Sequence, residues 1–239
     1  MSFTVIILAA GKGSRMKSST SKPLHKIAGC ELIEWVLEAS RKAGAAQIIP
    51  VMREEMFDLA SYLSDYSTAI QKEANGTADA VVAALPHIRN LNQPVIVLYA
   101  DTPFITAEII SSLYHKIYSG NDICVLGFHT DNPYGYGRLI QSSTGGLKAI
   151  VEESEASKSE KMIKNVNAGI MAFNGNIIEK MISKVDRSNA KEEYFLTDIV
   201  SIGNDNNLNV DYILTEYEYV IGINDRDQLA FAESLAQNY

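Results

Sequence analysis

Short apolar runs alternate with helix-like segments from residue 3 to about residue 128, and this alternation constrains the fold more than any other feature of the chain. Runs that suit buried strands lie at residues 5–9, 47–52, 68–71, 94–99 and 123–128. Segments with apolar residues at helical spacing lie at 31–43, 56–63, 77–87 and after Thr106. Such alternation is typical of a mostly parallel sheet with covering helices. We therefore predict an α/β fold, with Thr77 and Thr106 as helix-capping residues.

The pattern changes in the second half of the chain. Two strand-like segments, 137–141 and 147–151, flank Thr144-Gly145-Gly146, which is typical of a hairpin turn. A further strand is predicted at 168–173, with a helix after it. No linker, low-complexity stretch or internal repeat interrupts the 239 residues. The second half is therefore expected to add antiparallel strands to the same sheet.

Composition excludes several classes of function. A net charge of −8 disfavours long nucleic acid as a partner. No apolar run approaches the roughly 20 residues that a membrane span needs, and two cysteines, Cys30 and Cys124, make neither a disulfide framework nor a metal site. These features predict a cytoplasmic protein with reduced thiols and no membrane partner. Residues 1–30 nevertheless hold five basic and no acidic residues, which indicates a local anion site.

The first predicted strand runs directly into a glycine-rich loop, Leu-Ala-Ala-Gly-Lys-Gly-Ser-Arg-Met at residues 8–16. Glycines after a buried strand let the backbone approach a ligand and present its N–H groups to phosphate. The Gly-Lys-Ser/Thr of a P-loop is absent, and Met16 stands where a dinucleotide fingerprint needs its third glycine. The remaining interpretations are a loop that wraps a nucleoside triphosphate, with Arg15 and Lys22 on its phosphates, and a plain strand–helix turn.

The loop and the Ser21-Lys22-Pro23-Leu24 that follows it resemble the opening motif of the sugar-nucleotide pyrophosphorylases. Further matching motifs are Gln71 with Asn75-Gly76-Thr77-Ala78, Leu98-Tyr99-Ala100-Asp101-Thr102-Pro103, Gly135-Tyr136-Gly137-Arg138, Ile150-Val151-Glu152-Glu153, Asn167-Ala168-Gly169-Ile170, Glu193-Tyr194-Phe195-Leu196-Thr197-Asp198 and Gly222-Ile223-Asn224-Asp225. Their order and spacing resemble the uridyltransferase domain of the bacterial bifunctional N-acetylglucosamine-1-phosphate uridyltransferase/glucosamine-1-phosphate acetyltransferases. The resemblance covers nearly the whole chain.

The resemblance implies a Rossmann-like nucleotidyltransferase fold of the GT-A-like type in one domain, 1–239. Residues 1–128 would mainly bind the nucleotide and residues 129–239 the sugar. The implied reaction joins UTP to N-acetylglucosamine 1-phosphate, with Mg²⁺ as cofactor, and yields pyrophosphate and UDP-N-acetylglucosamine for peptidoglycan precursor synthesis. The family's second domain, a β-helix that carries the acetyltransferase and builds the trimer, is not among these residues. Acetyl transfer and trimer formation are therefore not carried over.

The resemblance also implies roles for individual residues. The nucleotide would be held by Leu8, Ala9, Ala10, Gly11, Gln71, Gly76 and Thr77, with Gln71, Gly76 and Thr77 at the uracil. Arg15 and Lys22 would hold phosphates as catalytic residues. The sugar would be bound by Tyr99, Ala100, Gly137, Glu152 and Asn167. Asp101 and Asn224 would be the magnesium ligands.

Four positions depart from the family pattern. Ser14 stands where threonine is usual, and Ala100 replaces a glycine between Tyr99 and Asp101, where its methyl group is expected to crowd the backbone near the sugar. Glu192 replaces another glycine, and Asp225 replaces an asparagine beside the metal ligand Asn224.

The chemistry of the residues agrees with uridylyl transfer. Attack by a sugar phosphate oxygen on the α-phosphorus of UTP requires positioning and charge neutralisation rather than a strong base. Mg²⁺ prefers hard oxygen ligands, so one carboxylate and one amide oxygen suffice. Asp101 follows a buried strand, at the end where open α/β sheets bind ligands. Taken alone, Asp101 also suits a turn or helix cap, and Asn224 suits a turn.

Three other functions stay open at this stage. A sibling enzyme would use glucose 1-phosphate with UTP or dTTP. A catalytically silent module would bind a sugar nucleotide and regulate a partner, although it would not need the pair Asp101 and Asn224. An NAD-dependent enzyme is disfavoured by Met16.

Overall fold

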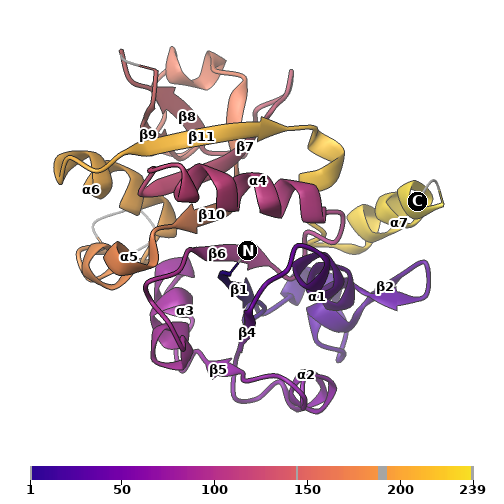
Figure 1. Ribbon diagram of the computed structural model, residues 1–239. Helices are drawn as coiled ribbons and strands as arrows, with labels where there is room; N and C mark the ends of the chain where they lie inside the picture. Colours follow the sequence, from indigo (N-terminus) through magenta and orange to yellow (C-terminus); the bar gives the residue numbers. More distant parts are fainter. Residues whose placement is uncertain (1, 144, 188–192, 238–239) are drawn as a thin grey trace.

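The computed structural model describes residues 2–143, 145–187 and 193–237, and it confirms the predicted α/β fold. A nine-stranded sheet runs through the molecule in the order β11-β7-β10-β6-β1-β4-β5, with β8 and β9 as a side branch from β10 (Figure 1). The first half contributes β1 (Thr4–Leu8), β4 (Gln47–Met52), β5 (Ala69–Ile70) and β6 (Val95–Tyr99). These four strands are parallel, and β1 lies between β4 and β6.

β1 shows why the apolar runs form the middle of the sheet. All five of its residues are buried. Side chains alternate across a strand, so Val5 and Ile7 belong to one core and Ile6 and Leu8 to another on the opposite face. A strand buried on both faces needs this unbroken apolar sequence.

Helices cover both faces of the sheet. α1 (Leu32–Lys42), α2 (Phe57–Tyr62) and α4 (Ala107–Tyr118) bury apolar residues in the core that holds Val5. α3 (Thr77–Ala84), α5 (Gly175–Ile182) and α6 (Ile199–Asp205) pack in the core that holds Ile6. Short 3-10 turns lie at Ser14–Met16, Lys22–Leu24, Leu85–His87, Glu160–Met162, Leu196–Asp198 and Tyr217–Val220. No helix in the described part of the chain is long and apolar enough to cross a membrane.

The second half adds the expected antiparallel strands. β10 (Asn165–Phe173) is antiparallel to β6 and to β7 (Ile123–His129). β8 (Arg138–Gln141) and β9 (Leu147–Val151) form the predicted hairpin, although Thr144 in its turn lies outside the described residues. β11 (Val210–Thr215), which the sequence pattern did not predict, pairs in parallel with β7 at the sheet edge.

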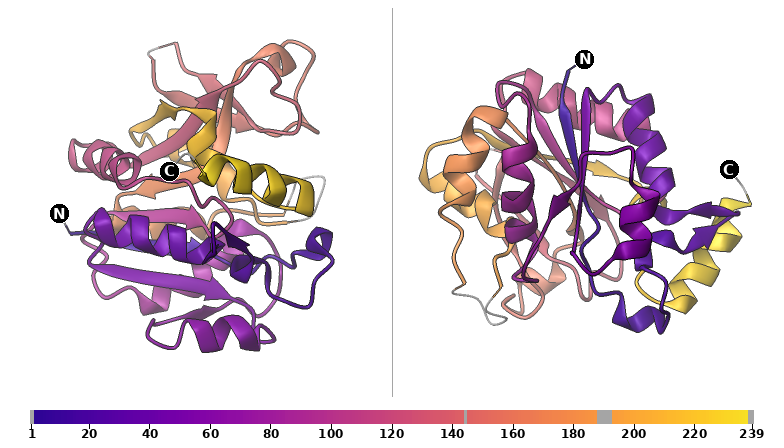
Figure 2. Two further views of the ribbon diagram at one scale, coloured as in Figure 1. Left: turned by 90° about the vertical axis from the view of Figure 1, so that its right-hand side faces the viewer. Right: turned by 90° about the horizontal axis from the view of Figure 1, so that it is seen from below.

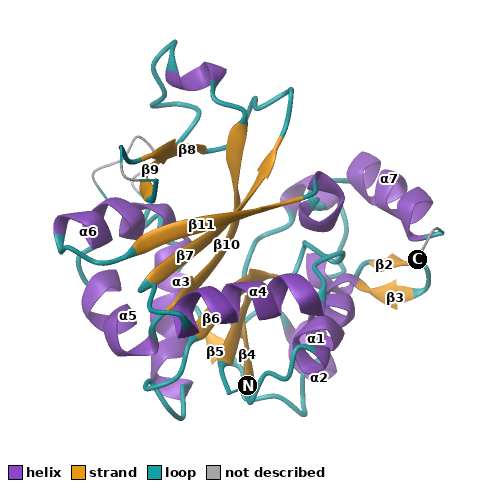
Figure 3. Cartoon of the chain, turned by 45° about the horizontal axis from the view of Figure 1, so that its top comes forward, coloured by secondary structure: helices purple, strands orange, loops and turns teal. Residues whose placement is uncertain are grey.

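The C-terminal helix α7 (Arg226–Ala236) packs beside a two-stranded ribbon, β2 (Lys26–Ile27) and β3 (Cys30–Glu31), on one side of the sheet (Figures 1 and 3). Ile27, Phe104 and Ala232 share a small core there. The Ala28 N–H donates to Glu233 Oε2 at 2.9 Å. The second view in Figure 2 shows the yellow C-terminal helix against indigo N-terminal segments. This packing brings the turn before α7 close to the glycine-rich loop.

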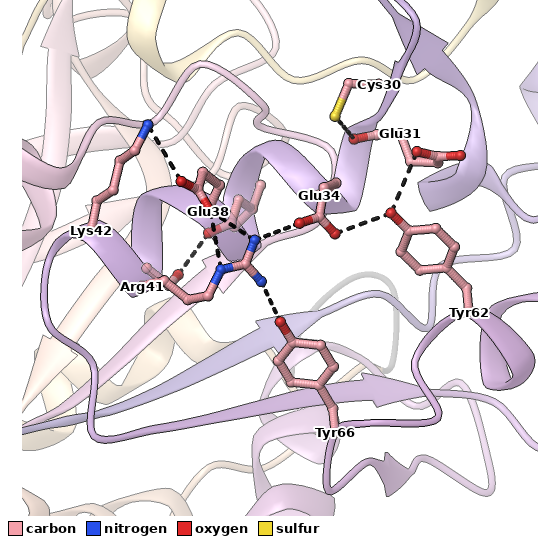
Figure 4. A network of polar contacts seen from close by, with 10 residues as sticks. Cys30, Glu31, Glu34, Glu38, Arg41, Lys42, Tyr62 and Tyr66 are labelled. Atoms are coloured by element: carbon pink, nitrogen blue, oxygen red, sulfur yellow. Dashed lines mark hydrogen bonds and ion pairs between the residues drawn. The ribbon is translucent and has the colours of Figure 1, made fainter.

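A polar network on the outer surface connects α1 with the segments that follow it (Figure 4). The Arg41 guanidinium donates to Glu34 Oε1 at 2.5 Å and to Glu38 Oε2 at 2.8 Å, and it also contacts the Tyr66 hydroxyl. The Tyr62 hydroxyl donates to Glu34 Oε2 at 3.0 Å. Exposed pairs of this kind contribute little free energy individually, so the network mainly fixes how α2 lies on α1.

Candidate functional site

A cleft of about 500 Å³ opens where β1 and β6 end, at the carboxyl edge of the parallel strands. Open α/β sheets bind their ligands at this edge. Thirteen of the residues singled out in the sequence line this one cleft: Leu8, Ala9, Ala10, Gly11, Arg15, Lys22, Gln71, Gly76, Thr77, Tyr99, Ala100, Asp101 and Asn224. They come from five separate parts of the chain, so only the fold brings them together.

The glycine-rich loop forms one wall of the cleft. The Ala9 N–H donates to Val51 O and the Ala100 N–H donates to Leu8 O, which extends the sheet pairing into the loop. Gly13 has a φ of 59°, and a Cβ added there would lie 2.8 Å from Lys22 Cβ. Glycine at this position therefore allows the Lys22 segment to pack closely against the loop. Arg15 is exposed at the cleft.

Lys22 is held in the cleft by its neighbours. The Ser21 N–H donates to Asp58 Oδ2 at 2.8 Å, and the Ser21 hydroxyl donates to Asp58 Oδ1 at 2.5 Å. Pro23 is buried. The Lys22 ammonium then donates to Asp101 Oδ2 and, at 2.9 Å, to Asn224 Oδ1. The two predicted metal ligands thus converge on one cationic atom, and the lysine side chain is only 11% exposed.

The turn that carries Asn224 is fixed on both sides. The Ile223 N–H donates to Asp101 O at 2.9 Å, and the Asn224 N–H donates to Gln228 Oε1 at 2.7 Å. Asp225, which departs from the family pattern, caps α7 by accepting from the Gln228 N–H at 2.9 Å. Aspartate suits a helix N-terminus through both its hydrogen bond and its charge. The side chain of Asp225 is therefore engaged with the helix that follows it.

The Gln71–Thr77 segment forms the opposite wall. Gly76 has a φ of 117°, and a Cβ there would lie 2.5 Å from Tyr194 O. The Tyr194 N–H donates to Asn75 O at 2.7 Å, and the Ala78 N–H donates to Tyr194 O at 2.9 Å. Only glycine combines this backbone conformation with such a close approach. Glu192, another departure from the family pattern, lies outside the described residues.

The prediction that Thr77 caps its helix is wrong. The capping position is Gly76, and Thr77 is the first helical residue of α3. Its hydroxyl oxygen accepts from the Leu196 N–H at 2.9 Å, a contact made through the fold. The threonine therefore joins the two segments of this wall. Thr106 does cap α4 as predicted, accepting from the Ile109 N–H.

Tyr99 lines the cleft and also lies against Gly169 in the second half of the chain. Burial, followed by the charge of Asp101, raises the pKa of Tyr99, and the Glu152 carboxylate raises it further. The phenol therefore stays neutral at physiological pH. Gly169 lies in an irregular part of β10 with a φ of 86°, and a Cβ there would come within 3.0 Å of the Tyr99 ring. Ala100 is 2% exposed and packs in the core with residues of α1 and α4.

The other predicted sugar residues form a cluster of their own beyond Tyr99. The Asn167 N–H donates to Gly137 O at 2.8 Å. A Cβ on Gly137 would lie 3.4 Å from Glu152 Oε1, which also accepts from the Thr197 hydroxyl at 3.3 Å. None of Gly137, Glu152 and Asn167 lines the main cleft; Glu152 borders a hollow of about 210 Å³ beside Phe195. The structure brings these three residues together, but it places them outside the main cleft that Asp101 lines.

Two structural features went unnoticed in the sequence. Arg138 is 1% exposed, and its guanidinium pairs with Glu153 Oε2 at 2.5 Å and donates to Tyr136 O. The hydrogen bond from Arg138 leads the causes that lower the pKa of Glu153. Asp79 accepts a hydrogen bond from Gln71. An arginine in a motif and an aspartate in a first helical turn are both common, so neither gave a specific signal.

Asp101 and Asn224 fit a divalent cation. A carboxylate oxygen and an amide oxygen are hard ligands of the kind that Mg²⁺ prefers. Asn224 Nδ2 lies 3.5 Å from Gly222 O, so the amide oxygen is the atom that faces Lys22. The ammonium between the two oxygens marks a position where positive charge is already stabilised.

Comparison with known proteins identifies the family. Residues 5–165 match the family described as the MobA-like NTP transferase domain. The chain belongs to this family. The sequence-based prediction of a nucleotidyltransferase is thereby confirmed.

Relatives of this NTP transferase domain include two proteins named bifunctional protein GlmU. The protein from Maricaulis maris is 38% identical over 238 residues, which are 98% of this chain and 52% of the relative. The protein from Bartonella quintana is 39% identical over 236 residues, which are 97% of this chain and 52% of the relative. The resemblance to the bifunctional enzymes is therefore confirmed, and the chain spans about half the length of the curated relatives it matches.

The same NTP transferase fold occurs in a distant solved structure. A crystal structure of a UDP-glucose pyrophosphorylase complexed with UDP-glucose superposes with a TM-score of 0.78 over 100% of this chain and 99% of that chain. The sequence identity is 17%, so the likeness concerns the fold.

Proposed function

We propose that this NTP transferase domain transfers a uridylyl group from UTP to N-acetylglucosamine 1-phosphate, giving UDP-N-acetylglucosamine and pyrophosphate. The observation that carries the proposal is the convergence of Lys22, Asp101 and Asn224 in the cleft that the glycine-rich loop also lines. The motif resemblance supplies the substrates. The relatives named bifunctional protein GlmU support it.

The nucleotide occupies the cleft between the two walls. Leu8 to Gly11, Arg15 and Lys22 line the cleft. In this proposal the backbone of the first segment and the side chains of Arg15 and Lys22 border the phosphates. Gln71, Gly76 and Thr77 also line the cleft, and in this proposal they border the uracil. Because hydrogen-bonded backbone turns line the cleft, its backbone needs little reorganisation when the nucleotide binds, which favours both binding and orientation. The Lys22 ammonium, in contrast, would have to leave Asp101 and Asn224 when Mg²⁺ binds there.

Asp101 and Asn224 hold Mg²⁺ in this proposal. The ion supplies charge neutralisation on the phosphates, which is the main requirement of phosphoryl-type transfer. Lys22 stands beside both ligands, so its ammonium reaches the same phosphates. A phosphate oxygen of the sugar phosphate forms the new bond to the α-phosphorus, and the bond to the bridging oxygen of pyrophosphate breaks. The attacking oxygen is already anionic, so no protein base has to remove a proton.

The acceptor sugar lies towards the cluster of Gly137, Glu152 and Asn167. Glu152 Oε1 accepts from the Thr197 hydroxyl. A carboxylate is an acceptor-only group, so in this proposal Glu152 accepts hydrogen bonds from sugar hydroxyl or amide groups. Tyr99 stays a neutral phenol between the two parts of the site, so its ring separates the sugar from the metal ligands without adding charge.

The proposal is tested by pyrophosphate release from UTP and Mg²⁺ with N-acetylglucosamine 1-phosphate, glucosamine 1-phosphate or glucose 1-phosphate. Release with the N-acetylated sugar alone is the expected result. Release with glucose 1-phosphate alone would contradict the proposed acceptor and favour a sibling enzyme. No release with any sugar, while UTP still binds, would contradict transfer and favour a silent binding module.

A further inference from the structure

The side-chain amide of Gln71 is held in one orientation. Gln71 is 5% exposed and borders the cleft. Its Nε2 atom donates to Gly76 O at 3.0 Å and to Asp79 Oδ2 at 2.9 Å. A primary amide nitrogen carries two hydrogens, so these bonds use both. The carbonyl oxygen Oε1 accepts no hydrogen bond from another described residue, and it remains the polar atom available to a ligand in the cleft.

The two partners of Nε2 make the opposite orientation unfavourable. Gly76 O and the Asp79 carboxylate are acceptors only. Turning the amide by 180° would place Oε1 against both oxygens and would lose both hydrogen bonds. Bonds to a charged acceptor are the stronger kind, so Asp79 contributes more to the preference than the backbone carbonyl does.

Asp79 is itself well placed for this contact. It lies in the first turn of α3, where the helix dipole stabilises a negative charge. Gly76, the residue before this helix, is fixed by its close approach to Tyr194. Gln71 follows β5 and its N–H donates to Met52 O at 2.9 Å. The three groups are therefore positioned by separate backbone contacts rather than by one another.

We propose that Asp79 is a specificity-determining residue, because its carboxylate forces Gln71 to present a hydrogen-bond acceptor to the nucleobase. Uracil carries a donor, N3–H, in the middle of its pairing edge, whereas cytosine carries an acceptor, N3, at the same position. Oε1 accepts from uracil and faces an unpaired acceptor in cytosine, which is costly in a desolvated site. Thymine has the same N3–H, so this device does not distinguish UTP from dTTP. The inference rests on the proposed function, since it places a pyrimidine at Gln71.

Asp79→Asn tests the proposal with little change of shape. An asparagine amide both donates and accepts, so the introduced amide and that of Gln71 can turn together and Gln71 can offer Nε2 to the base. We expect the ratio of the dissociation constants for CTP and UTP, measured by calorimetry with Mg²⁺, to fall about tenfold. Asp79→Glu retains an acceptor-only group, so this variant is expected to keep most of the wild-type ratio of the CTP and UTP dissociation constants. Glu108→Gln, the same chemical change in the first turn of α4, is the matched control and is expected to leave the ratio unchanged.

The outcomes distinguish failure of the proposed function from failure of the role of Asp79. Wild-type protein that binds neither nucleotide overturns the proposed function, and this inference with it. Wild-type protein that prefers UTP, together with an Asp79→Asn variant that keeps the full ratio, overturns only the role of Asp79. If Asp79→Asn does not fold, Asp79→Ser replaces it, because a hydroxyl also donates and accepts. A folded serine variant with an unchanged ratio likewise contradicts the proposal.

Discussion

The main cleft and the cluster of predicted sugar residues, Gly137, Glu152 and Asn167, are built by different means. In the cleft, polar side chains from separately fixed backbone segments bond to one another: Lys22 binds Asp101 and Asn224, and Gln71 binds Asp79. In the cluster beyond Tyr99, a backbone bond joins two of the three predicted sugar residues, Asn167 and Gly137. The third, Glu152, accepts a long hydrogen bond from the Thr197 hydroxyl.

This difference predicts two classes of mutational effect. Side chains in the cleft project from parallel strands and turns that are fixed independently, so changing them should alter chemistry more than folding. Residues of the cluster lie on antiparallel strands and loops beside the ion pair of buried Arg138 with partly exposed Glu153. Changing those contacts should alter sugar recognition and stability together.

The largest effect is expected for Asp101→Asn. The substitution removes the charge that we propose holds a divalent cation but keeps an oxygen that accepts from Lys22, so the fold should be retained. We expect turnover to fall by about 10²–10³-fold, the scale on which single electrostatic groups act. Pyrophosphate release measures the loss, with Asp131→Asn as a control at a carboxylate that is 89% exposed. Full turnover of the Asp101 variant would refute the metal assignment.

Lys22→Ala should lower turnover by about 10²-fold while changing the KM for UTP less, because the ammonium acts most strongly on charge that develops in the transition state. Steady-state kinetics separate the two constants. Lys26→Ala is the matched control, since Lys26 is 58% exposed and pairs with Glu31. Unchanged catalytic efficiency of the Lys22 variant would contradict its role.

Arg138→Lys tests whether the predicted sugar residues can be disturbed without disturbing the main cleft. Lysine cannot reproduce the two directed contacts to Glu153 and Tyr136. We expect the KM for the sugar phosphate to rise about tenfold as the adjoining Glu152 shifts, and the free energy of unfolding to fall by about 1–3 kcal/mol. Calorimetric UTP binding should stay at the wild-type value. A loss of UTP affinity equal to the loss for the sugar would show that the two regions are not separate.

The smallest effect concerns pH. Burial, then the charges of Glu155, Asp186 and Glu152, raise the pKa of Asp198 from 3.8 to about 6. A carboxyl with a raised pKa binds its proton more tightly when folded, so its contribution to stability is present below about pH 4 and lost as the pH rises through 6. The free energy of unfolding of Asp198→Asn, relative to that of wild type, should therefore be higher at pH 7 than at pH 4. The expected change is about 1 kcal/mol after allowance for solvent screening of the half-buried group.

Denaturant unfolding of Asp198→Asn and wild type at pH 4, 5, 6 and 7 provides the measurement. A constant difference between the two proteins across this range would contradict the shifted pKa.

The sequence predicted the parts of the fold that depend on local patterns. β1 and β6 were recognised because strands buried on both faces need continuous apolar sequence. β11 was missed because it lies at the sheet edge with most of its residues only partly buried, so its polar residues interrupt the pattern. Thr77 was assigned as a cap because threonine often caps helices, but its oxygen is used by Leu196. That contact arises only in the folded chain.

In the candidate site, too, some residues could be predicted from local sequence patterns and others depend on contacts that form only in the folded chain. Asp101 could be placed from the rule that ligands bind where parallel strands end. Asn224 could be assigned only through the resemblance, because its turn reaches Asp101 through the packing of α7. The orientation of Gln71 depends on its hydrogen bonds to Gly76 O at 3.0 Å and to Asp79 Oδ2 at 2.9 Å, a detail that no periodicity encodes.

The central claim is that this cleft carries out uridylyl transfer, and labelled UTP tests it most directly. The protein is incubated with Mg²⁺, N-acetylglucosamine 1-phosphate and UTP labelled at the α-phosphorus, and the products are separated. Attack on the α-phosphorus predicts that the label appears in UDP-N-acetylglucosamine and that the released pyrophosphate is unlabelled. Label that remains in UTP, or that appears in UMP or UDP without joining the sugar, would contradict the account.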